Sequence, residues 1–203
     1  MSASLRRAAG IVAVALAAGV ALSGCTINFG YPDGDRGTGW MGDSGPGNGM
    51  MGDLDGFSPV DIMFAQMMIP HHQQAVDMSE LAIEKTTDPD VRALAEQIRD
   101  AQAPEIELME SWLDEAGSRM PRGDMGMGMG GMLSEAEMAA LENATGPDFD
   151  RLFLEGMIEH HEGAILMTRM ILESRNSEVK ELGEAIVESQ TAEIEQMEQM
   201  LDE

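Results

Sequence analysis

The residues best suited to chemistry are four histidines in two adjacent pairs, His71 with His72 and His160 with His161. They are the only histidines among the 203 residues of the chain. Methionines flank both pairs at helical spacing, namely Met68, Met78, Met157 and Met167. Imidazole and thioether groups together favour copper, and Cu(I) in particular, over iron, calcium or magnesium. The pattern therefore indicates a soft metal site, in which the methionines act as ligands or gates.

Two other metal chemistries match these residues less well. Di-iron four-helix proteins place a glutamate three residues before a ligating histidine, whereas this chain reads MIPH and MIEH, with Met68 and Met157 at that position. The HExxH zinc motif does not occur in the sequence, and the only cysteine is Cys25. Glu105 and Glu193 are carboxylates that can orient the imidazoles or bind a harder ion.

A structural role is the main alternative for the histidines. A single histidine in a helical bundle is more often a hydrogen-bonded core residue or a surface residue than a ligand, and methionine at helical spacing is usually core filler. Burying several imidazoles and carboxylates without partners is costly, however, and a metal ion can satisfy them. On the metal hypothesis, His71 and His160 are inner ligands, and His72 and His161 are secondary ligands nearer the surface.

The histidine pairs belong to an internal repeat. FAQMMIPHHQQAVDM (64–78) matches FLEGMIEHHEGAILM (153–167) at an offset of 89, with Phe, Met, Ile, both His, Ala and Met in register. VRALAEQIRDAQAPEIELM (91–109) matches VKELGEAIVESQTAEIEQM (179–197) at an offset of 88. One two-helix unit therefore occurs twice.

Helix signals indicate how this unit folds. Ser58 and Asp88 have the N-cap pattern, and each is followed by a proline at the first helical position. Short links within each unit require antiparallel hairpins, and two hairpins can bury their apolar stripes against each other. We therefore predict an all-α four-helix bundle over 57–203. Its long helices are expected at 59–85, 89–116, 147–174 and 178–202.

Two features of the bundle are irregular. Pro70 and Pro104 lie inside predicted helices, where each removes a backbone hydrogen bond and is expected to kink its helix at a cost of about 3 kcal/mol. The crossover between the hairpins, 117–146, is long and contains a predicted short helix that starts after Ser134. Its methionines on a glycine-rich stretch could collect Cu(I) weakly; they are Met120, Met125, Met127, Met129 and Met132.

The N-terminus has the features of an export signal. Arg6 and Arg7 precede an apolar run of signal-peptide length, and LSGC ends at Cys25. This arrangement resembles the lipobox of bacterial lipoproteins, which implies that residues 1–24 are a signal peptide removed before Cys25 and that Cys25 carries lipid. Residues 25–56 are rich in Gly, Asp and Pro, and we predict a flexible tether. The domain is thus expected outside the cytoplasm, anchored to the cell membrane.

The charge of the chain limits its partners. The formal net charge is -25 at pH 7. A phosphate backbone would repel such a protein, so nucleic acid is not expected as a partner. Weak capture of cations and binding to positively charged proteins are compatible with this charge, although most of the carboxylates are expected simply to solvate helix faces.

The twin motifs MIxHHxxAxxM and QxxEIxxM resemble those of the domain of unknown function 305 family over residues 57–202. The resemblance implies a ferritin-like bundle, export, and a link to copper binding and tolerance. It implies that the family's motif histidines and methionines correspond here to His71, His72, His160, His161, Met68, Met78, Met157 and Met167. It completes the second motif with Glu105, Met109, Glu193 and Met197. The second copy departs from the first at Gly156 and Glu159, where the first has Met67 and Pro70.

We therefore predict an extracytoplasmic, lipid-anchored protein that sequesters Cu(I) or hands it to a partner protein, and that is not an enzyme. Two alternatives remain open. One is a ferritin-like oxidase with paired metals, which would need carboxylates bridging two ions. The other is an acidic interaction module that binds no metal tightly and whose histidines sense pH.

Overall fold

The computed structural model describes residues 56–121 and 130–202, which form helices and no β-strand. The helices are α1 (Pro59–Lys85), α2 (Pro89–Glu115), α3 (Glu135–Asn143), α4 (Pro147–Thr168) and α5 (Ser177–Leu201). None of the helices in this part of the chain is long and apolar enough to cross a membrane. The predicted signal peptide, Cys25 and nearly all of the predicted tether lie outside the described residues, as do Met125, Met127 and Met129.

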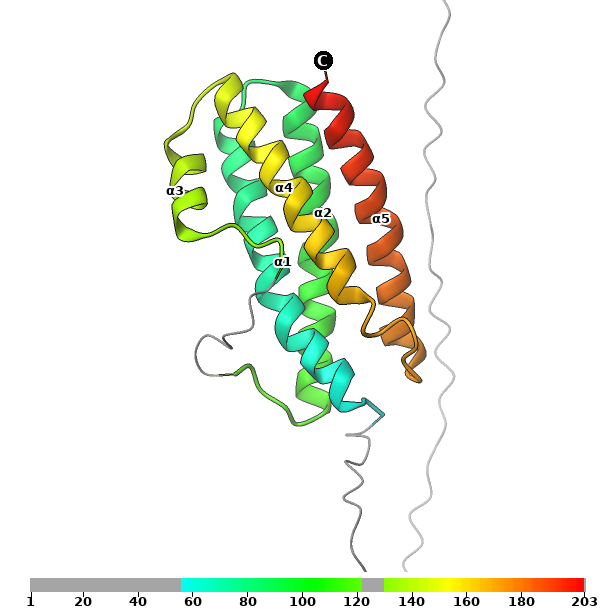
Figure 1. Cartoon of the computed structure of the whole chain (residues 1–203). Helices are drawn as coiled ribbons and strands as arrows, with labels where there is room; N and C mark the ends of the chain where they lie inside the picture. The colour runs from blue at the N-terminus through cyan, green and yellow to red at the C-terminus, as the bar shows by residue number, and fades with distance from the viewer. Residues whose placement is uncertain (1–55, 122–129, 203) are drawn as a thin grey trace, which may run out of the picture. The chain divides into compact units, whose positions relative to one another are not determined.

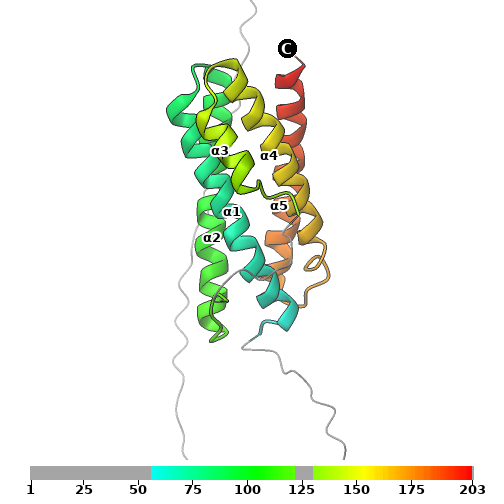
Figure 2. The ribbon, with the colours of Figure 1, turned by 60° about the vertical axis from the view of Figure 1, so that its left-hand side comes forward.

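The long helices form two antiparallel hairpins, α1 with α2 and α4 with α5, which pack together mainly through α1 and α4 (Figure 1). The short α3 lies against α4 on the outside of the bundle, as Figure 2 shows from a second direction. The predicted all-α bundle of two duplicated hairpins is therefore confirmed. Both α1 and α2 continue without interruption through the prolines at 70 and 104.

The helix starts follow local capping chemistry. At α1 the Ser58 hydroxyl accepts a hydrogen bond from the Asp61 N–H, and the Asp61 carboxylate accepts one from the Ser58 N–H. Ser134 and Glu137 form the same reciprocal pair at α3. Asp88 caps α2 and Asn176 caps α5 through their side chains. These contacts satisfy N–H groups that have no partner inside the helix.

The predicted helix at 147–174 is too long, because α4 ends at Thr168. From there the chain forms tighter turns, in which the Met170 N–H donates to Met167 O and the Ile171 N–H donates to Thr168 O, at 3.1 and 3.0 Å. The early turn places Ile171 in the core, fully buried. Its side chain packs where α5 has Gly183, so no side chain of α5 obstructs it.

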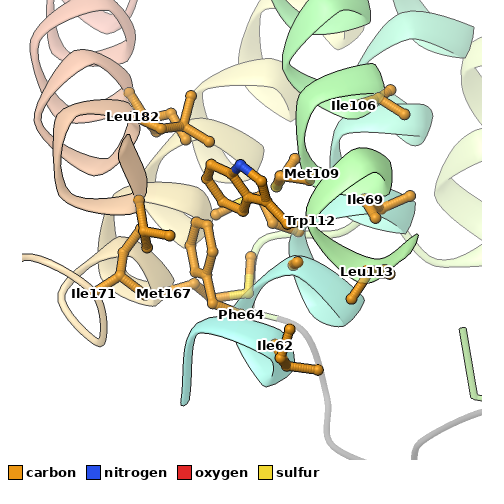
Figure 3. Close-up of a cluster of buried hydrophobic side chains, with 14 of the residues drawn as sticks. Ile62, Phe64, Ile69, Ile106, Met109, Trp112, Leu113, Met167, Ile171 and Leu182 are labelled. Carbon is orange, nitrogen blue, oxygen red and sulfur yellow. The ribbon is translucent and has the colours of Figure 1, made fainter. Parts of the chain in front are cut away.

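The core consists of two apolar clusters. Cluster 1 contains Phe64, Met68 and Trp112, together with residues from α4 and α5, as seen in Figure 3. Cluster 2 contains Phe153, Met157 and the opposite ends of the same helices. Along α2, α4 and α5, residues of one cluster are followed by buried polar residues and then by residues of the other cluster, and α1 follows the same order except that Val76 of cluster 1 lies beyond its histidines. A polar layer therefore crosses the middle of the bundle.

Candidate metal centre

The polar layer contains all four histidines, and each is fully buried. The rings of His71 on α1 and His160 on α4 face each other with centroids 3.8 Å apart and planes tilted by 40°. The repeat explains this contact, since equivalent positions of two helices meet where α1 packs on α4. The structure thus brings the two predicted inner ligands together in the interior.

His72 and His161 each contact a glutamate on the partner helix of the same hairpin. The Nε2 atom of His72 lies 2.8 Å from Oε2 of Glu105, and Nε2 of His161 lies 2.8 Å from Oε2 of Glu193. A carboxylate accepts a hydrogen bond here, so Nε2 donates in both pairs. Glu105 and Glu193 thus contact the imidazoles that they were predicted to orient.

The expected position of His72 and His161 nearer the surface is wrong, because both rings are 0% exposed. A helical rotation of 100° from the inner histidines moves them away from the bundle axis, but each ring then lies against the neighbouring helix of its own hairpin. The glutamates are the more exposed members of these pairs. The Glu105 side chain is 19% exposed and that of Glu193 is 6% exposed.

Several ring nitrogens in this layer have no hydrogen-bond partner among the described residues. They are Nδ1 of all four histidines and also Nε2 of His160. The Nε2 atom of His71, by contrast, lies 3.2 Å from the carbonyl oxygen of Gly130, to which it donates. Ligating histidines in proteins commonly donate one ring N–H to a carbonyl or carboxylate and bind metal through the other nitrogen. Three of these rings have that arrangement.

The inner pair is held neutral. Burial lowers the pKa of His71 from 6.5 to about 3, with the neighbouring His72 adding to the effect. Burial also lowers the pKa of His160 well below 6.5, and the facing His71 ring contributes. A neutral imidazole keeps a lone pair, which is the form that binds metal.

The six predicted methionines divide between the two apolar clusters. Met68, Met109 and Met167 belong to cluster 1, and Met78, Met157 and Met197 belong to cluster 2. The repeat relates these sets member by member, at offsets of 89, 88 and 89. Each side of the histidine layer therefore has three thioethers. All are fully buried except Met167, which is 7% exposed.

The carboxylates near the histidine layer lie apart from each other. Within residues 56–121 and 130–202, no three His, Cys, Asp or Glu side chains are placed to hold a metal together. The carboxylates of Glu105 and Glu193 each contact a different histidine. Around the histidine layer, the six buried thioethers outnumber these two carboxylates. Of the predicted crossover methionines in the described residues, Met120 is 40% exposed and Met132 is half-buried.

Some residues of the layer were not predicted as part of the site. Gln97 on α2 donates to Oε1 of Glu193 at 3.1 Å, and so links the two hairpins. Gln102 and Gln190 are buried in the layer and occupy equivalent repeat positions, which is the signal that could have identified them. The Gly130 carbonyl had no such signal, because a backbone oxygen leaves no trace in residue type.

Solved proteins share this architecture. A DUF305 protein from Streptomyces coelicolor, named as a candidate secreted protein, is 37% identical, with a TM-score of 0.66 over 70% of this chain and 91% of its own. A DUF305 fragment from Deinococcus radiodurans is 36% identical, with a TM-score of 0.67 over 71% of this chain and 97% of its own.

CopM, a third protein of this architecture, has been solved in Cu(I)-, Cu(II)- and silver-bound forms. In its Cu(I)-bound form it is 35% identical, with a TM-score of 0.60 over 70% of this chain and 95% of its own.

The sequence relationship extends over the whole described domain. A protein of Acanthamoeba polyphaga mimivirus is 42% identical over 55 residues, so the match spans only 36% of that relative's length. The family described as Domain of unknown function (DUF305), by contrast, matches residues 61–201. The chain therefore belongs to the DUF305 family.

Proposed function

We propose that this protein binds copper, preferentially as Cu(I), within the buried histidine layer. The observation that carries the proposal is the set of buried ring nitrogens without partners, five in all, between two groups of methionines. Leaving such atoms unsatisfied is costly, and a soft ion would satisfy them with donors that it prefers. The copper- and silver-bound forms of CopM support the same chemistry.

Specific residues would hold the ion. His71 and His160 are the inner ligands on this proposal, and Met68 and Met157 supply thioethers three residues before them. Met78 and Met167 lie two turns beyond the same histidines and are further soft ligands or gates. His72 and His161 contribute their free Nδ1 atoms, with Glu105 and Glu193 fixing the rings through Nε2. Met109 and Met197 are auxiliary members of the two methionine sets.

The biological role that we propose is sequestration of copper outside the cytoplasm or its transfer to a partner protein, without turnover. Cys25 would carry the lipid that attaches the protein to the cell membrane. Two clusters of soft donors suit reversible binding, since thioethers hold Cu(I) without the strongly bound thiolates of a structural site. A ferritin-like oxidase would need carboxylates shared between ions, whereas each glutamate here contacts its own imidazole.

The central test is a competitive titration of the purified protein with Cu(I) and with Cu(II). The double variant His71→Leu with His160→Leu keeps the buried volume but removes the inner nitrogens. We expect its Cu(I) affinity to fall by more than about 100-fold, because losing a residue that only orients a ligand already costs about 10- to 100-fold. Met68→Leu with Met157→Leu should weaken Cu(I) more than Cu(II), because thioethers prefer the softer ion.

Met200→Leu is the matched control, because Met200 is a partly buried methionine at the edge of cluster 2 and away from the histidine layer. Its Cu(I) affinity should equal that of the wild type. An unchanged affinity in the double histidine variant would remove the proposed site, and any copper bound would then be on the acidic surface.

A further inference from the structure

A short segment of the crossover lies directly on the histidine layer. We call residues 130–133 the strap. Its first residue places the Gly130 carbonyl 3.2 Å from Nε2 of His71. Its last residue is held by Gln74 on α1, whose side-chain N–H donates to Leu133 O at 2.9 Å and whose Oε1 accepts from the Leu133 N–H at 2.8 Å. Both ends of the strap are therefore tied to α1 next to the inner site.

Glycines on α4 make room for the strap. A Cβ atom added to Gly163 would lie 1.9 Å from the Gly130 oxygen and 2.9 Å from Cα of Gly131. Gly156, two turns earlier on the same face, has Leu133 side-chain atoms from 3.1 Å. The contact at Gly163 is with backbone, so no side-chain rotation could relieve it. Any residue other than glycine there would displace the strap.

The internal repeat shows that these positions are specialised. The first-repeat equivalent of Gly163 is Gln74, and that of Gly156 is Met67. At these equivalent positions, Gln74 hydrogen-bonds the strap through its side-chain amide, and Gly163 leaves the strap room because it has no side chain. The strap occurs only once, between the hairpins, so it cannot obey the symmetry of the repeat. The sequence diverges at the places where the strap breaks that symmetry.

The consequence falls on the two inner histidines. A carbonyl oxygen only accepts, so His71 must carry its proton on Nε2, which leaves Nδ1 as the nitrogen able to bind metal. Among the described residues, no partner lies within hydrogen-bond distance of either His160 nitrogen, so no contact like that of Gly130 selects its tautomer. His71 and His160 are thus the same residue type at equivalent positions, but only the His71 ring is fixed by a hydrogen bond to the strap.

We propose that Gly163 and Gln74 are positioning residues that act through the strap to fix His71 as the permanent metal ligand, leaving His160 as the exchangeable one. This inference rests on the proposed copper site. It adds to that site an order of release, because a ligand whose far nitrogen is fixed by a hydrogen bond should dissociate less readily than one whose far nitrogen has no such bond.

The first experiment reads the imidazole nitrogens of the metal-free protein by ¹⁵N NMR, comparing the wild type with Gly163→Ala. We expect wild-type His71 to be a single tautomer protonated at Nε2, and the variant to lose that single state as the strap is displaced. Gly183→Ala is the matched control, since it adds the same methyl group to a buried helical glycine that contacts the side chains of Ile171 and Thr168 instead of the strap. It should leave His71 unchanged.

Gln74→Ala provides a second route that adds no clash and keeps the proposal testable if Gly163→Ala does not fold. It removes both hydrogen bonds to Leu133 and should likewise release the His71 tautomer. In both variants we expect Ag(I), a diamagnetic soft ion, to bind about 10- to 100-fold more weakly and to pass faster to a competing chelator. Gly183→Ala should exchange Ag(I) at the wild-type rate.

A wild-type His71 protonated at Nδ1, or a His71 that keeps its Nε2 proton in both strap variants, would overturn the proposal. Unchanged Ag(I) exchange in both variants would do the same. Failure of wild-type protein to bind Ag(I) or Cu(I) would instead refute the copper site itself. The tautomer measurement needs no metal, so the two failures are distinguishable.

Discussion

Each imidazole of the polar layer has its own electrostatic surroundings, although all four are equally buried. His72 and His161 lie against carboxylates, whereas His71 and His160 face each other and have no ion pair with an acidic group in 56–121 or 130–202. A proton on either inner ring would have to be buried without a counter-charge, close to a second ring that could also be charged. His71 and His160 are therefore kept neutral, the form that the proposed ion would need, while His72 and His161 are oriented by their glutamates.

This neutrality predicts a pH dependence of the metal-free protein. In the unfolded chain His71 titrates near 6.5, but in the folded protein its pKa is about 3, and the pKa of His160 is also well below 6.5. Between these values the unfolded state binds more protons, so the free energy of unfolding falls as the pH falls below about 6.5. Each ring contributes up to about 1.4 kcal/mol per pH unit. Above that range the two rings add no slope.

Urea unfolding at pH 7.5, 6.0 and 5.0 measures the effect, with a chelator present. The control is His160→Leu, which removes one buried titrating ring and should lose part of the pH slope. Protonating the many surface carboxylates at low pH relieves self-repulsion and so raises the free energy of unfolding. The difference between the two proteins is therefore the informative quantity, because this effect is common to both. Parallel slopes in the wild type and the variant would contradict the depressed pKa of His160.

At the scale of helices, the parts that follow local rules could be predicted from the sequence. The caps at Ser58, Asp88 and Ser134 depend on residues within three positions, and the repeat fixed which helices are equivalent. The end of α4 could not be predicted in the same way. The segment after Thr168 has no glycine or proline to stop the helix, and it turns because Ile171 fills the space above Gly183 on another helix.

The site was predictable to the same extent and for the same reason. Helical spacing put His71 and His160 on the inward stripe, and the repeat made them partners. The burial of His72 and His161 depends on how closely the two helices of each hairpin approach, which spacing along one helix does not report. The strap contact depends on a backbone carbonyl brought from 59 residues away, so no pattern of side chains encodes it directly.

At the scale of the whole molecule, the inner site joins the two hairpins. His71 belongs to α1 and His160 to α4, so an ion bound to both would crosslink halves of the bundle that otherwise meet through packing and through hydrogen bonds such as that of Gln97 with Glu193. The unfolded chain has no such preformed arrangement. Binding should therefore add its free energy to folding, as expected when a ligand binds only the native state.

This linkage predicts that a soft ion raises the melting temperature. Free Ag(I) at 100 times its Kd adds about 2.7 kcal/mol, which corresponds to a rise in Tm of roughly 5–10 °C for a chain of this size. Thermal unfolding followed by circular dichroism in chloride-free buffer measures it. Because a chain with a net charge of -25 can also attract cations non-specifically, Ca²⁺ serves as the control for the acidic surface. The double variant His71→Leu with His160→Leu should show no more stabilisation by Ag(I) than by Ca²⁺. If Ag(I) raised the Tm of that variant as much as that of the wild type, the stabilising ion would lie outside the histidine layer.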